Sequence, residues 1–394
     1  MNLLHLLAAD PLFNDGVDVG VVLIVALKTL ITFAVLMVAV LFMVWYERKL
    51  ISDMQNRIGP AKAGGRFGVL QSLADGIKLF FKEDLLPERA DKRVFRLAPY
   101  LSAVPAFLSF AVVPVGGTIT IASHQTNLQL ADPPVGILFL LAMSGISVYG
   151  VMLAGWSSGS KYPLLGSVRA SAQMVSYEAA LGLSIATVVV VAGSLSTHAI
   201  VVDQSGAGPG GFLPSWNIIR LGVVPFVIFM IAATAELNRP PFDLVEAEQE
   251  LVGGFHTEYS SIRFALFFLA EFMNTVTWSA IIVTLFLGGP SGPLLGVLPD
   301  WLWPIVWFLA KLMVFLSVYV WFRATLPRLR YDQLMDLGWK VLIPLSLFWL
   351  LVIAAVRVES WYAAVAIPAG LAIAFLLSRA MQVGRARVEE KVGQ

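Results

Sequence analysis

VVLIVALKTLITFAVLMVAVLFMVW, residues 21–45, contains a single charged side chain, Lys28. A helix of about 20 such residues, rising 1.5 Å per residue, crosses the hydrocarbon core of a bilayer. Similar apolar runs follow along the chain. The sequence therefore predicts an all-α, polytopic membrane helix bundle of about nine transmembrane helices with amphipathic helices on its cytoplasmic side. The predicted spans are 21–45, 97–115, 135–156, 177–195, 218–235, 264–287, 302–324, 341–356 and 361–379. The eighth is short, and a helix that turns back within the membrane is its alternative.

The composition excludes several classes of protein. Charged residues make up 13% of the chain and hydrophobic residues 58%, whereas a soluble domain is about 25% charged. A formal net charge of +1 argues against a nucleic-acid partner. The chain has no cysteine, and none of its four histidines lies inside an apolar run. We therefore expect no haem, flavin, iron–sulfur cluster or metal to be bound by this chain.

Lysine and arginine alternate between the two sides of the predicted bundle. Eleven of them lie in residues 46–96, whereas segments 1–20, 116–134, 196–217 and 288–301 contain none. Because basic residues stay on the cytoplasmic side, we expect the N-terminus outside and the C-terminus in the cytoplasm. The first residues lack a basic stretch, so no cleaved signal peptide is expected.

We interpret residues 1–394 as a single membrane domain. Its parts are the first span (21–45), a basic loop with an interfacial helix (46–96), spans two to five (97–235), an acidic loop-helix (236–263), spans six and seven (264–324), a basic loop (325–340), spans eight and nine (341–379) and a tail (380–394).

Residues 67–81 of the first basic segment have the pattern of an amphipathic helix. Val69, Leu73 and Ile77 recur at helical spacing, while Asp75 and Lys78 fall on other faces. This pattern is typical of a helix lying in the membrane interface. A basic segment that binds anionic lipid headgroups is the simpler alternative. It does not explain the compact set Glu47, Arg48, Gln55, Arg57, Gly59 and Pro60.

The second informative segment, residues 234–264, reads TAELNRPPFDLVEAEQELVGGFHTEYSSIRF. Pro240–Pro241 ends the fifth span and can start a helix that Gly253–Gly254 terminates. On such a helix Asp243, Glu246 and Glu250 share one face. If that face is buried, the carboxylates titrate as a coupled set and can relay protons. A solvated acidic loop is the alternative, and we favour burial because apolar spans flank the segment.

Charged residues inside predicted spans are costly and need a reason. Glu178 begins the fourth span, Glu236 ends the fifth and Glu271 lies inside the sixth. We favour a functional role for these three residues, as members of a chain of carboxylates that relays protons. We expect Lys28 to reach the outer interface with its long side chain. Lys311 is either a counter-ion for Glu271 or part of a charge path.

Four segments resemble a known family. ERKLISDMQNRIGP (47–60) with GVLQSLADGIKLFFKED (68–84), and AELNRPPFDLVEAEQELVGGFHTEYS (235–260), are similar to signatures of the H subunit of proton-pumping NADH:quinone oxidoreductase, respiratory complex I, the counterpart of mitochondrial subunit 1. RASAQMVSYE (169–178) and RATLPRLRYDQLMDLGWK (323–340) are further matches. The arginines of the last segment also fit simple anchors on the positive side.

The resemblance implies a quinone, ubiquinone or menaquinone, as the substrate of an enzyme complex in which this chain holds no redox centre. It implies a quinone chamber entered beside the first span and the 67–81 helix, and an acidic channel leading away from it. Chamber residues would be Glu47, Arg48, Arg57, Asp75, Lys78, Arg239 and Phe242. Proton-relay residues would be Glu178, Glu236, Asp243, Glu246, Glu248, Glu250, Glu258, Glu271 and Lys311, none of them catalytic in the strict sense.

The same resemblance implies partners and a location. The partners are the peripheral-arm subunits of the quinone site, the antiporter-like membrane subunits and membrane lipids. The location is the bacterial inner membrane. Two alternatives remain open: a proton-coupled secondary transporter, which predicts an internal repeat that the sequence lacks, and a membrane anchor of a related hydrogenase complex without a quinone site.

Overall fold

A computed structural model of the chain describes residues 10–13, 16, 18–121, 124–206, 214–244, 252–293, 296, 298–359, 361–362 and 368. Within these residues the protein is helical apart from one antiparallel pair of strands, β1 (Thr118–Ile121) and β2 (His124–Asn127). Thr118 pairs with Asn127 and Ile121 with His124. The predicted all-α membrane bundle is confirmed, with this hairpin as an addition in the loop after the second predicted span.

Six helical stretches of the described part are long and apolar enough to cross a bilayer. They are α2 (Val19–Met54), α5 (Gly136–Ser157), α6 (Lys161–Ala192), α11 (Ser261–Phe286), α12 (Trp303–Thr325) and the continuous stretch Tyr331–Val358. The second and fifth predicted spans correspond to α4 (Lys92–Phe110) and α9 (Val223–Glu236). The remaining elements are η1 (Pro11–Phe13), α3 (Gln71–Phe81), α7 (Thr197–Gln204), α8 (Asn217–Arg220) and η2 (Gly254–His256). The predicted ninth span, 361–379, lies almost wholly outside the described residues.

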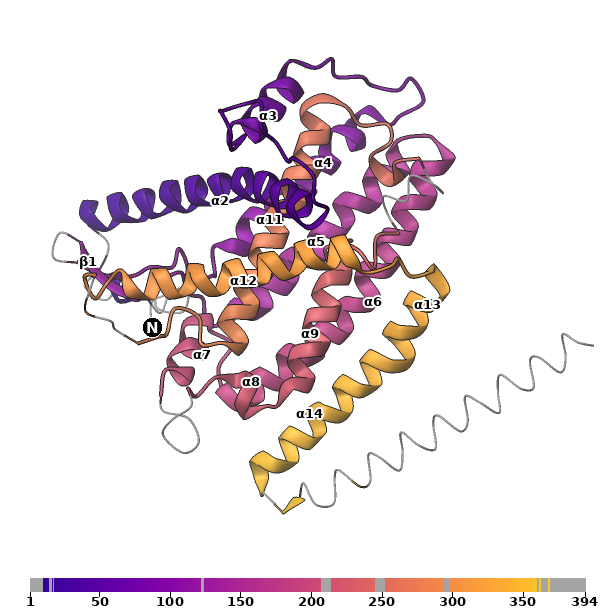
Figure 1. Ribbon diagram of the computed structural model, residues 1–394. Coiled ribbons are helices and arrows are strands. Elements are labelled where there is room, and N and C mark those ends of the chain that lie inside the picture. Colours follow the sequence, from indigo (N-terminus) through magenta and orange to yellow (C-terminus); the bar gives the residue numbers. More distant parts are fainter. Residues whose placement is uncertain are drawn as a thin grey trace, which may run out of the picture.

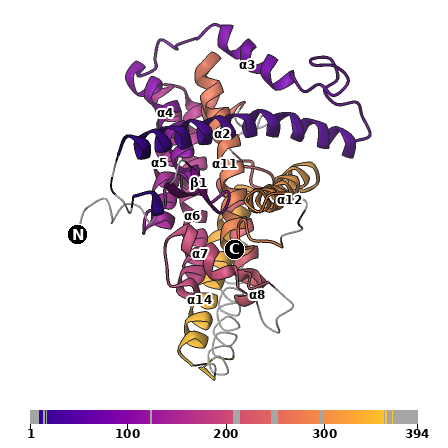
Figure 2. The same cartoon turned by 90° about the vertical axis from the view of Figure 1, so that its left-hand side faces the viewer.

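Helix α11 is the centre of the bundle. In its most apolar stretch 72% of the residues are buried, against 17% in α2, and every residue from Thr275 to Phe286 is buried. It contacts α2, α4, α9 and α12, and both views place it among the other helices (Figures 1 and 2). Helices α2 and α12 cross the others at a steep angle (Figure 1). A residue on α11 can therefore face either the α2 side or the α4–α5 side.

Helix α2 is longer than the predicted span 21–45. It begins at an Asp18 cap, whose carboxylate accepts from the Val21 amide at 2.7 Å, and continues through YERKLISDM to Met54. The chain turns at Asn56, which adopts φ +51°, a conformation that asparagine tolerates better than most residues. Glu47 and Arg48, predicted as loop residues, are consequently fixed on the same rigid helix as the first span.

Helix α6 also starts earlier than predicted. The expected loop containing Lys161 and Arg169 is helical, with Pro163 in the first turn, where a missing amide proton costs nothing. As a result Glu178 lies in the middle of a 32-residue helix rather than at its start. The helix packs closely on α5, where a Cβ at Gly155 would overlap Ser167 and the Pro163 carbonyl.

The fifth and eighth predicted spans differ from the observed helices in opposite ways. The fifth is split between α8 and α9 by Leu221 and Gly222, the latter at φ +80°, and Trp349 donates to the freed Leu221 carbonyl at 3.0 Å. The eighth is longer than 341–356, because α13 (Tyr331–Asp336), the π-helical turn η3 (Leu337–Leu342) and α14 (Ile343–Val358) form one stretch. This length fits a full crossing rather than a helix that turns back.

The predicted interfacial helix 67–81 is α3, which starts four residues later than expected. The delay has a steric reason: Gly68 has φ +64° and lies so close to the Pro60 carbonyl that a Cβ would overlap it. Trp45 of α2 donates to the Phe67 carbonyl at 2.8 Å, and Ser261 of α11 donates to the Leu79 carbonyl at 3.1 Å. Helix α3 is thus tied to both α2 and α11.

Lys28 is held in a largely buried ion pair and does not extend to solvent, which differs from the outward reach expected of its side chain. Its side chain is 12% exposed and pairs with Asp10 at 2.8 Å. Its Nζ also donates to Thr126 Oγ1 at 2.8 Å. The reason is that the segment before α2 folds back against the hairpin and supplies a carboxylate at the depth of the lysine.

Candidate functional site

Four charged side chains from four segments meet near the end of α2. Glu47 comes from α2, Arg239 from the turn after α9, Glu271 from α11 and Arg323 from the last turn of α12. Arg239 Nη1 donates to Glu47 Oε2 at 2.7 Å, and Arg239 Nη2 lies 3.1 Å from Glu271 Oε1. Arg323 donates to the other Glu47 oxygen. We call these four residues the charge cluster. Within it Glu47 is 4% exposed and Arg239 2%.

The position of Arg239 is set by the turn that follows α9. Asn238 adopts φ +52°, and the Phe242 amide donates to the Arg239 carbonyl at 2.9 Å. Gln173 of α6 holds the turn from the side, donating to the Ala235 carbonyl at 2.7 Å and to the Phe242 carbonyl at 2.9 Å. The guanidinium of Arg239 lies over the Phe272 ring at 4.7 Å from its centre, a favourable cation–π geometry.

The four members of the charge cluster balance one another in charge when Glu47 and Glu271 are both ionised, and Asp243 lies near enough to Glu271 for their charges to interact. Two guanidiniums, Arg239 and Arg323, face two carboxylates, Glu47 and Glu271. In a low-dielectric interior an unpaired charge is costly, so losing one member destabilises the others. A proton added to one carboxylate, or an anion placed beside either guanidinium, would therefore change the interactions of the whole cluster.

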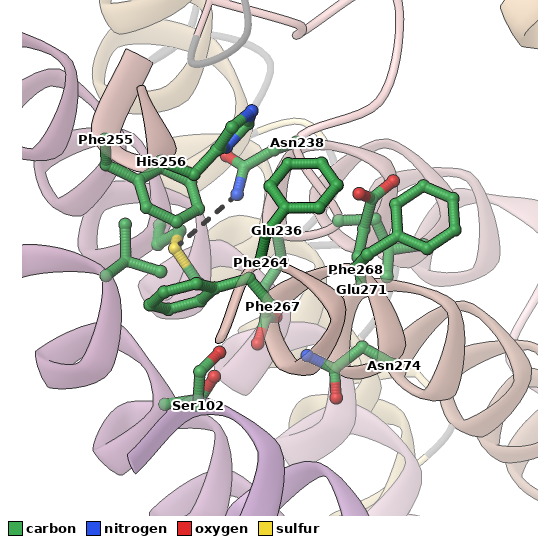
Figure 3. A pocket seen from close by; sticks show the side chains of 14 residues that line it. Ser102, Glu236, Asn238, Phe255, His256, Phe264, Phe267, Phe268, Glu271 and Asn274 are labelled. Atoms are coloured by element: carbon green, nitrogen blue, oxygen red, sulfur yellow. Dashed lines mark hydrogen bonds between the residues drawn. The ribbon is translucent and has the colours of Figure 1, made fainter. Parts of the chain in front are cut away.

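On the other side of Glu271 lies a small cavity of about 60 Å³. Figure 3 shows Glu236, Glu271, Asn274 and Ser102 among its lining side chains, with His256 and four phenylalanines around them. A cavity of some 10–15 Å³ already holds a water molecule, so there is room here for several. The volume is far below the roughly 300 Å³ at which small-molecule pockets begin. The cavity is therefore suited to water.

Glu236 projects into this cavity with one of its oxygens unsatisfied. Its side chain is 7% exposed and Ser144 of α5 donates to Oε1. No residue in the described ranges forms a hydrogen bond to Oε2. Glu236 also borders a smaller cavity of about 10 Å³ shared with Ser144 and Asn274. A buried carboxylate oxygen without a protein partner next to a cavity is the usual position of an ordered water.

Glu178 extends the acidic series from the cavity into α6. A Cβ built on Gly145, the residue after Ser144, would lie 3.5 Å from Glu178 Oε1, so this carboxylate lies directly beside the Ser144–Glu236 contact. The charges of Glu178 and Glu236 are close enough to interact. The structure thus places Glu271, a cavity with room for water, Glu236 and Glu178 in sequence, an arrangement through which protons can move between carboxylates.

Three of the seven predicted chamber residues, Glu47, Arg239 and Phe242, lie in or beside the charge cluster. Phe242 is 3% exposed and its ring lies 5.3 Å from that of Tyr177. Arg48 pairs with Asp75 of α3 at 2.5 Å, and the two side chains are 45% and 32% exposed. Arg57 and Lys78 are exposed, and Arg57 donates to Gln55 at 2.7 Å. These last four residues lie on the outer side of α2 and α3 and not in the buried cluster.

The predicted relay residues of the acidic segment divide into three groups. Asp243 lies close enough to Glu271 for their charges to interact, although Asp243 and Leu244 are not helical. Glu246, Glu248 and Glu250 lie outside the described residues. Glu258 lines a different hollow, together with Arg89 and Lys161, and not the cavity of Glu236.

Lys311 is not the counter-ion of Glu271. Its Nζ donates to three backbone carbonyls beyond the end of α11, those of Leu287, Gly289 and Ser291, at 2.7–2.9 Å. Leu287 is sixteen residues beyond Glu271, roughly 24 Å along a helix. Lys311 instead neutralises the negative end of α11 and the turn after it. The counter-ion of Glu271 is Arg239.

Several residues of the site were not among the predicted ones. Ser144 and Asn274 are polar residues inside apolar spans, and Asn274 follows Glu271 by one helical turn. This spacing was a usable signal for Asn274. Arg323, at the end of the seventh predicted span, fits a simple anchor on the positive side from sequence, because nothing in its segment indicates that its guanidinium turns back to Glu47. In the described part of the chain, no group of acidic or histidine side chains is arranged to hold a metal ion.

His256 lines the cavity from the side of η2, which lies directly on α6. A Cβ at Gly166 of α6 would come within 2.9 Å of the Gly254 backbone, so the absence of a side chain there permits the contact. The His256 ring packs on those of Phe255 and Phe264 at 5.0 and 5.3 Å. Burial lowers the pKa of the His256 imidazole to about 4, so the ring is neutral at neutral pH.

Comparison with known proteins gives a consistent result. The family model described as NADH dehydrogenase matches residues 27–354. The H subunit of NADH-quinone oxidoreductase from Frankia casuarinae is 53% identical over 359 residues, 90% of this chain and 75% of the relative. That of Frankia alni is 55% identical over 339 residues, 85% and 73%. That of Streptomyces avermitilis is 49% identical over 360 residues, 89% and 76%.

The charge cluster predicts that Arg239 matters more for stability than an exposed arginine. Substituting Arg239→Gln leaves Glu271 without its guanidinium and should lower the free energy of unfolding by about 3–5 kcal/mol. The matched variant Arg48→Gln breaks only the exposed pair with Asp75 and should cost at most about 1 kcal/mol. Thermal unfolding of the detergent-solubilised protein measures both. Equal losses in the two variants would contradict the account of the cluster.

The lowered pKa of His256 predicts acid sensitivity. Unfolded protein binds the proton with the ordinary pKa of 6.5 and folded protein only near 4. The contribution of this residue to stability is thus complete above about pH 6.5 and is lost as the pH falls toward 4. His256→Gln should flatten the fall of the unfolding midpoint over this range. Identical pH profiles for wild type and His256→Gln would refute the prediction.

Proposed function

Since the chain belongs to the NADH dehydrogenase family, as an H subunit of NADH-quinone oxidoreductase, we propose that it forms the membrane wall of a quinone-reduction chamber and couples quinone reduction to proton movement. As an H subunit it is a multi-pass membrane component of an enzyme complex, complex I, and its partners are the other subunits of that complex. The observation that carries the proposal is the position of Glu271, which pairs with Arg239 and also lines the cavity of Glu236.

The entrance of the chamber lies, in this proposal, between α2, α3 and α11. Leu73, Ile77 and Phe80 of α3 are exposed apolar side chains, about 50–70% accessible. They offer a surface that an isoprenoid tail can follow from the lipid. The Arg48–Asp75 pair and the Trp45–Phe67 hydrogen bond fix α3 against α2. The tail would pass along this interfacial helix toward the end of α2, where the charge cluster begins.

The quinone headgroup is proposed to approach the charge cluster from the α2 side. Reduction of a quinone to a quinol consumes two electrons and two protons. The electrons must come from other subunits, because this chain has no cysteine to hold an iron–sulfur cluster. Arg239 and Arg323 supply guanidinium donors that stabilise negative charge on a partly reduced headgroup.

Coupling follows from the competition for those guanidiniums. A new anion beside Arg239 weakens its interaction with Glu271, and a buried carboxylate that loses its cationic partner binds a proton more readily. The proton would come from water in the adjoining cavity. Glu236 and Glu178 would then supply a proton to replace it. In this way the redox event on the α2 side of α11 becomes a protonation event on its α5–α6 side. The charge interaction of Asp243 with Glu271 supports a role for Asp243 at the same junction.

The two alternative functions are less well supported. A secondary transporter has no use for a buried cluster that includes Glu47 from the end of α2, and three relatives at 49–55% identity are named as H subunits of NADH-quinone oxidoreductase. A quinone-independent anchor predicts that NADH oxidation by the complex is insensitive to quinone. The same experiments that test the relay also test this alternative.

The relay predicts linked losses in three glutamine variants of the complex. Glu178→Gln, Glu236→Gln and Glu271→Gln keep the shape of the side chain but remove the titratable proton. NADH:quinone reduction and proton uptake into inverted membrane vesicles should fall together, by at least about tenfold. NADH oxidation by a water-soluble acceptor that draws electrons from the peripheral arm should stay unchanged, which shows that the complex is assembled.

The exposed Glu83→Gln is the matched control for these variants, and all three activities should remain at the wild-type level. Wild-type quinone reduction and pumping in Glu236→Gln would remove the relay from the account. Loss of the water-soluble acceptor activity as well would indicate a failure of assembly, and Glu236→Asp, which retains the proton, then decides between the two readings.

The proposed entrance predicts a selective change in KM. Arg48→Gln removes an exposed ion pair worth up to about 1 kcal/mol and loosens α3. The KM for a quinone with a long isoprenoid tail should rise about two- to fivefold, while kcat and the KM for a short-tailed analogue change less. Lys62→Gln, an exposed lysine of the same basic segment, is the control. An equal rise for both quinones would place the entrance elsewhere.

A further inference from the structure

A cavity of about 320 Å³ lies far from the charge cluster, near the start of α2. Its walls come from α2, from the 110–130 segment with the β-hairpin, and from α12. They are almost entirely apolar and include Leu27, Ile31, Phe110, Ile119, Ile305 and Leu309. Lys28, on its wall, is nineteen residues from Glu47 along the same helix, roughly 28 Å. The proposed quinone path does not use this cavity.

One part of the wall is polar and is not fully satisfied by the protein. Lys28 Nζ has three protons but two acceptors within the described ranges, Asp10 and Thr126, each at 2.8 Å. Gln129, which is 4% exposed, donates through Nε2 to the Val112 and Ala131 carbonyls and to Thr197. Its Oε1 has no hydrogen-bond partner among the residues described. Lys28 Nζ therefore has a donor to spare for an occupant of the cavity.

The surroundings of the cavity indicate the source of that occupant. Leu27, Ile31 and Val35 line the cavity and are also 47%, 52% and 47% exposed on the surface of α2. These residues belong to a membrane-spanning stretch, so the cavity opens to lipid and not to water. The ion pair with Asp10 balances the charge of Lys28. A bare anion therefore has little attraction to the site, whereas a neutral carbonyl can accept from the ammonium.

The shape of the cavity indicates a chain rather than a compact molecule. The lining residues of α2 run from Ile24 to Val35, roughly 16 Å along the helix. A protein helix, about 10 Å across with its side chains, is too thick for a hollow of this volume. We propose that the cavity binds an acyl chain of a membrane phospholipid, with an ester carbonyl accepting from Lys28 Nζ.

Such a lipid would be structural rather than part of the bulk bilayer. It would fill the space between α2, α12 and the hairpin, and the Lys28–Asp10–Thr126 contacts already join two of these elements, α2 and the hairpin. Because α2 and α12 carry Glu47 and Arg323 at their other ends, an occupied cavity would help to fix the relative position of the two helices.

Photolabelling of the intact complex tests this proposal. The complex is reconstituted into vesicles that contain a phospholipid with a diazirine in its acyl chain, extracted and washed extensively with detergent, and then illuminated. Crosslinked peptides are mapped by mass spectrometry. We expect labelling at residues 24–35 and 305–309 to survive the wash. Labelling at residues 345–351 of α14, whose Leu345, Leu347 and Leu351 are 39–60% exposed, should disappear.

Two tryptophan variants provide the matched comparison. Leu27→Trp fills the cavity and should reduce the retained label at least about fivefold, the equivalent of 1 kcal/mol. Leu30→Trp places the same side chain on the exposed face of α2, which is outside the cavity lining, and should leave the label unchanged. If the complex does not assemble with Leu27→Trp, Ile31→Trp is used in its place. The comparison of retained label between residues 24–35 and 345–351 in the wild-type complex needs neither variant.

Three results would overturn the proposal. Parallel loss of label from residues 24–35 and 345–351 during the wash would show only bulk lipid around the helices. Full retention of label in an assembled cavity-filling variant would place the bound chain elsewhere. Displacement of the label by a long-tailed quinone, but not by unlabelled phospholipid, would show that the occupant is a quinone.

Discussion

Arg239 carries a positive charge into a part of the bundle where only 2% of its surface is accessible. Such a charge is stable there only with anions in contact. Glu47 and Glu271 provide them from two different helices, and the turn after α9 holds the guanidinium between them. The C-terminal parts of α2 and α12, the turn after α9 and the first half of α11 must therefore meet at this point. Keeping these charges paired constrains the arrangement of the surrounding helices.

The same constraint makes α11 the connecting element of the protein. Buried along most of its length, the helix presents Glu271 to Arg239 and to the cavity of Glu236. Two chemically different regions therefore share one carboxylate. A site that only anchored the helices would not need a second face with space for water and an unsatisfied carboxylate oxygen. In the proposed function, this shared position is what lets quinone chemistry on one side affect protonation on the other.

Much of this architecture was predictable from local sequence, and the rest depended on tertiary contacts. Apolar runs located eight helices that the structure describes, because a bilayer demands about 20 apolar residues per crossing. Their ends were missed, since polar turns such as those holding Glu47 and Arg169 remain helical once neighbouring helices cover them. Glu178, Glu236 and Glu271 were predicted because a charge inside a span is conspicuous. The roles of Arg323 and Lys311 were not, because the direction of a long side chain depends on its partners.

The central claim is that reduction of quinone changes the protonation of Glu271 and Glu236. Infrared difference spectroscopy of the intact complex, recorded between its oxidised and reduced states with bound quinone, measures the carboxylic acid C=O band directly. The account predicts a band change that Glu236→Gln removes in part and Glu271→Gln removes in part, with the quinone bands themselves retained. A carboxylic acid difference spectrum that is identical in wild type and in both variants would contradict it.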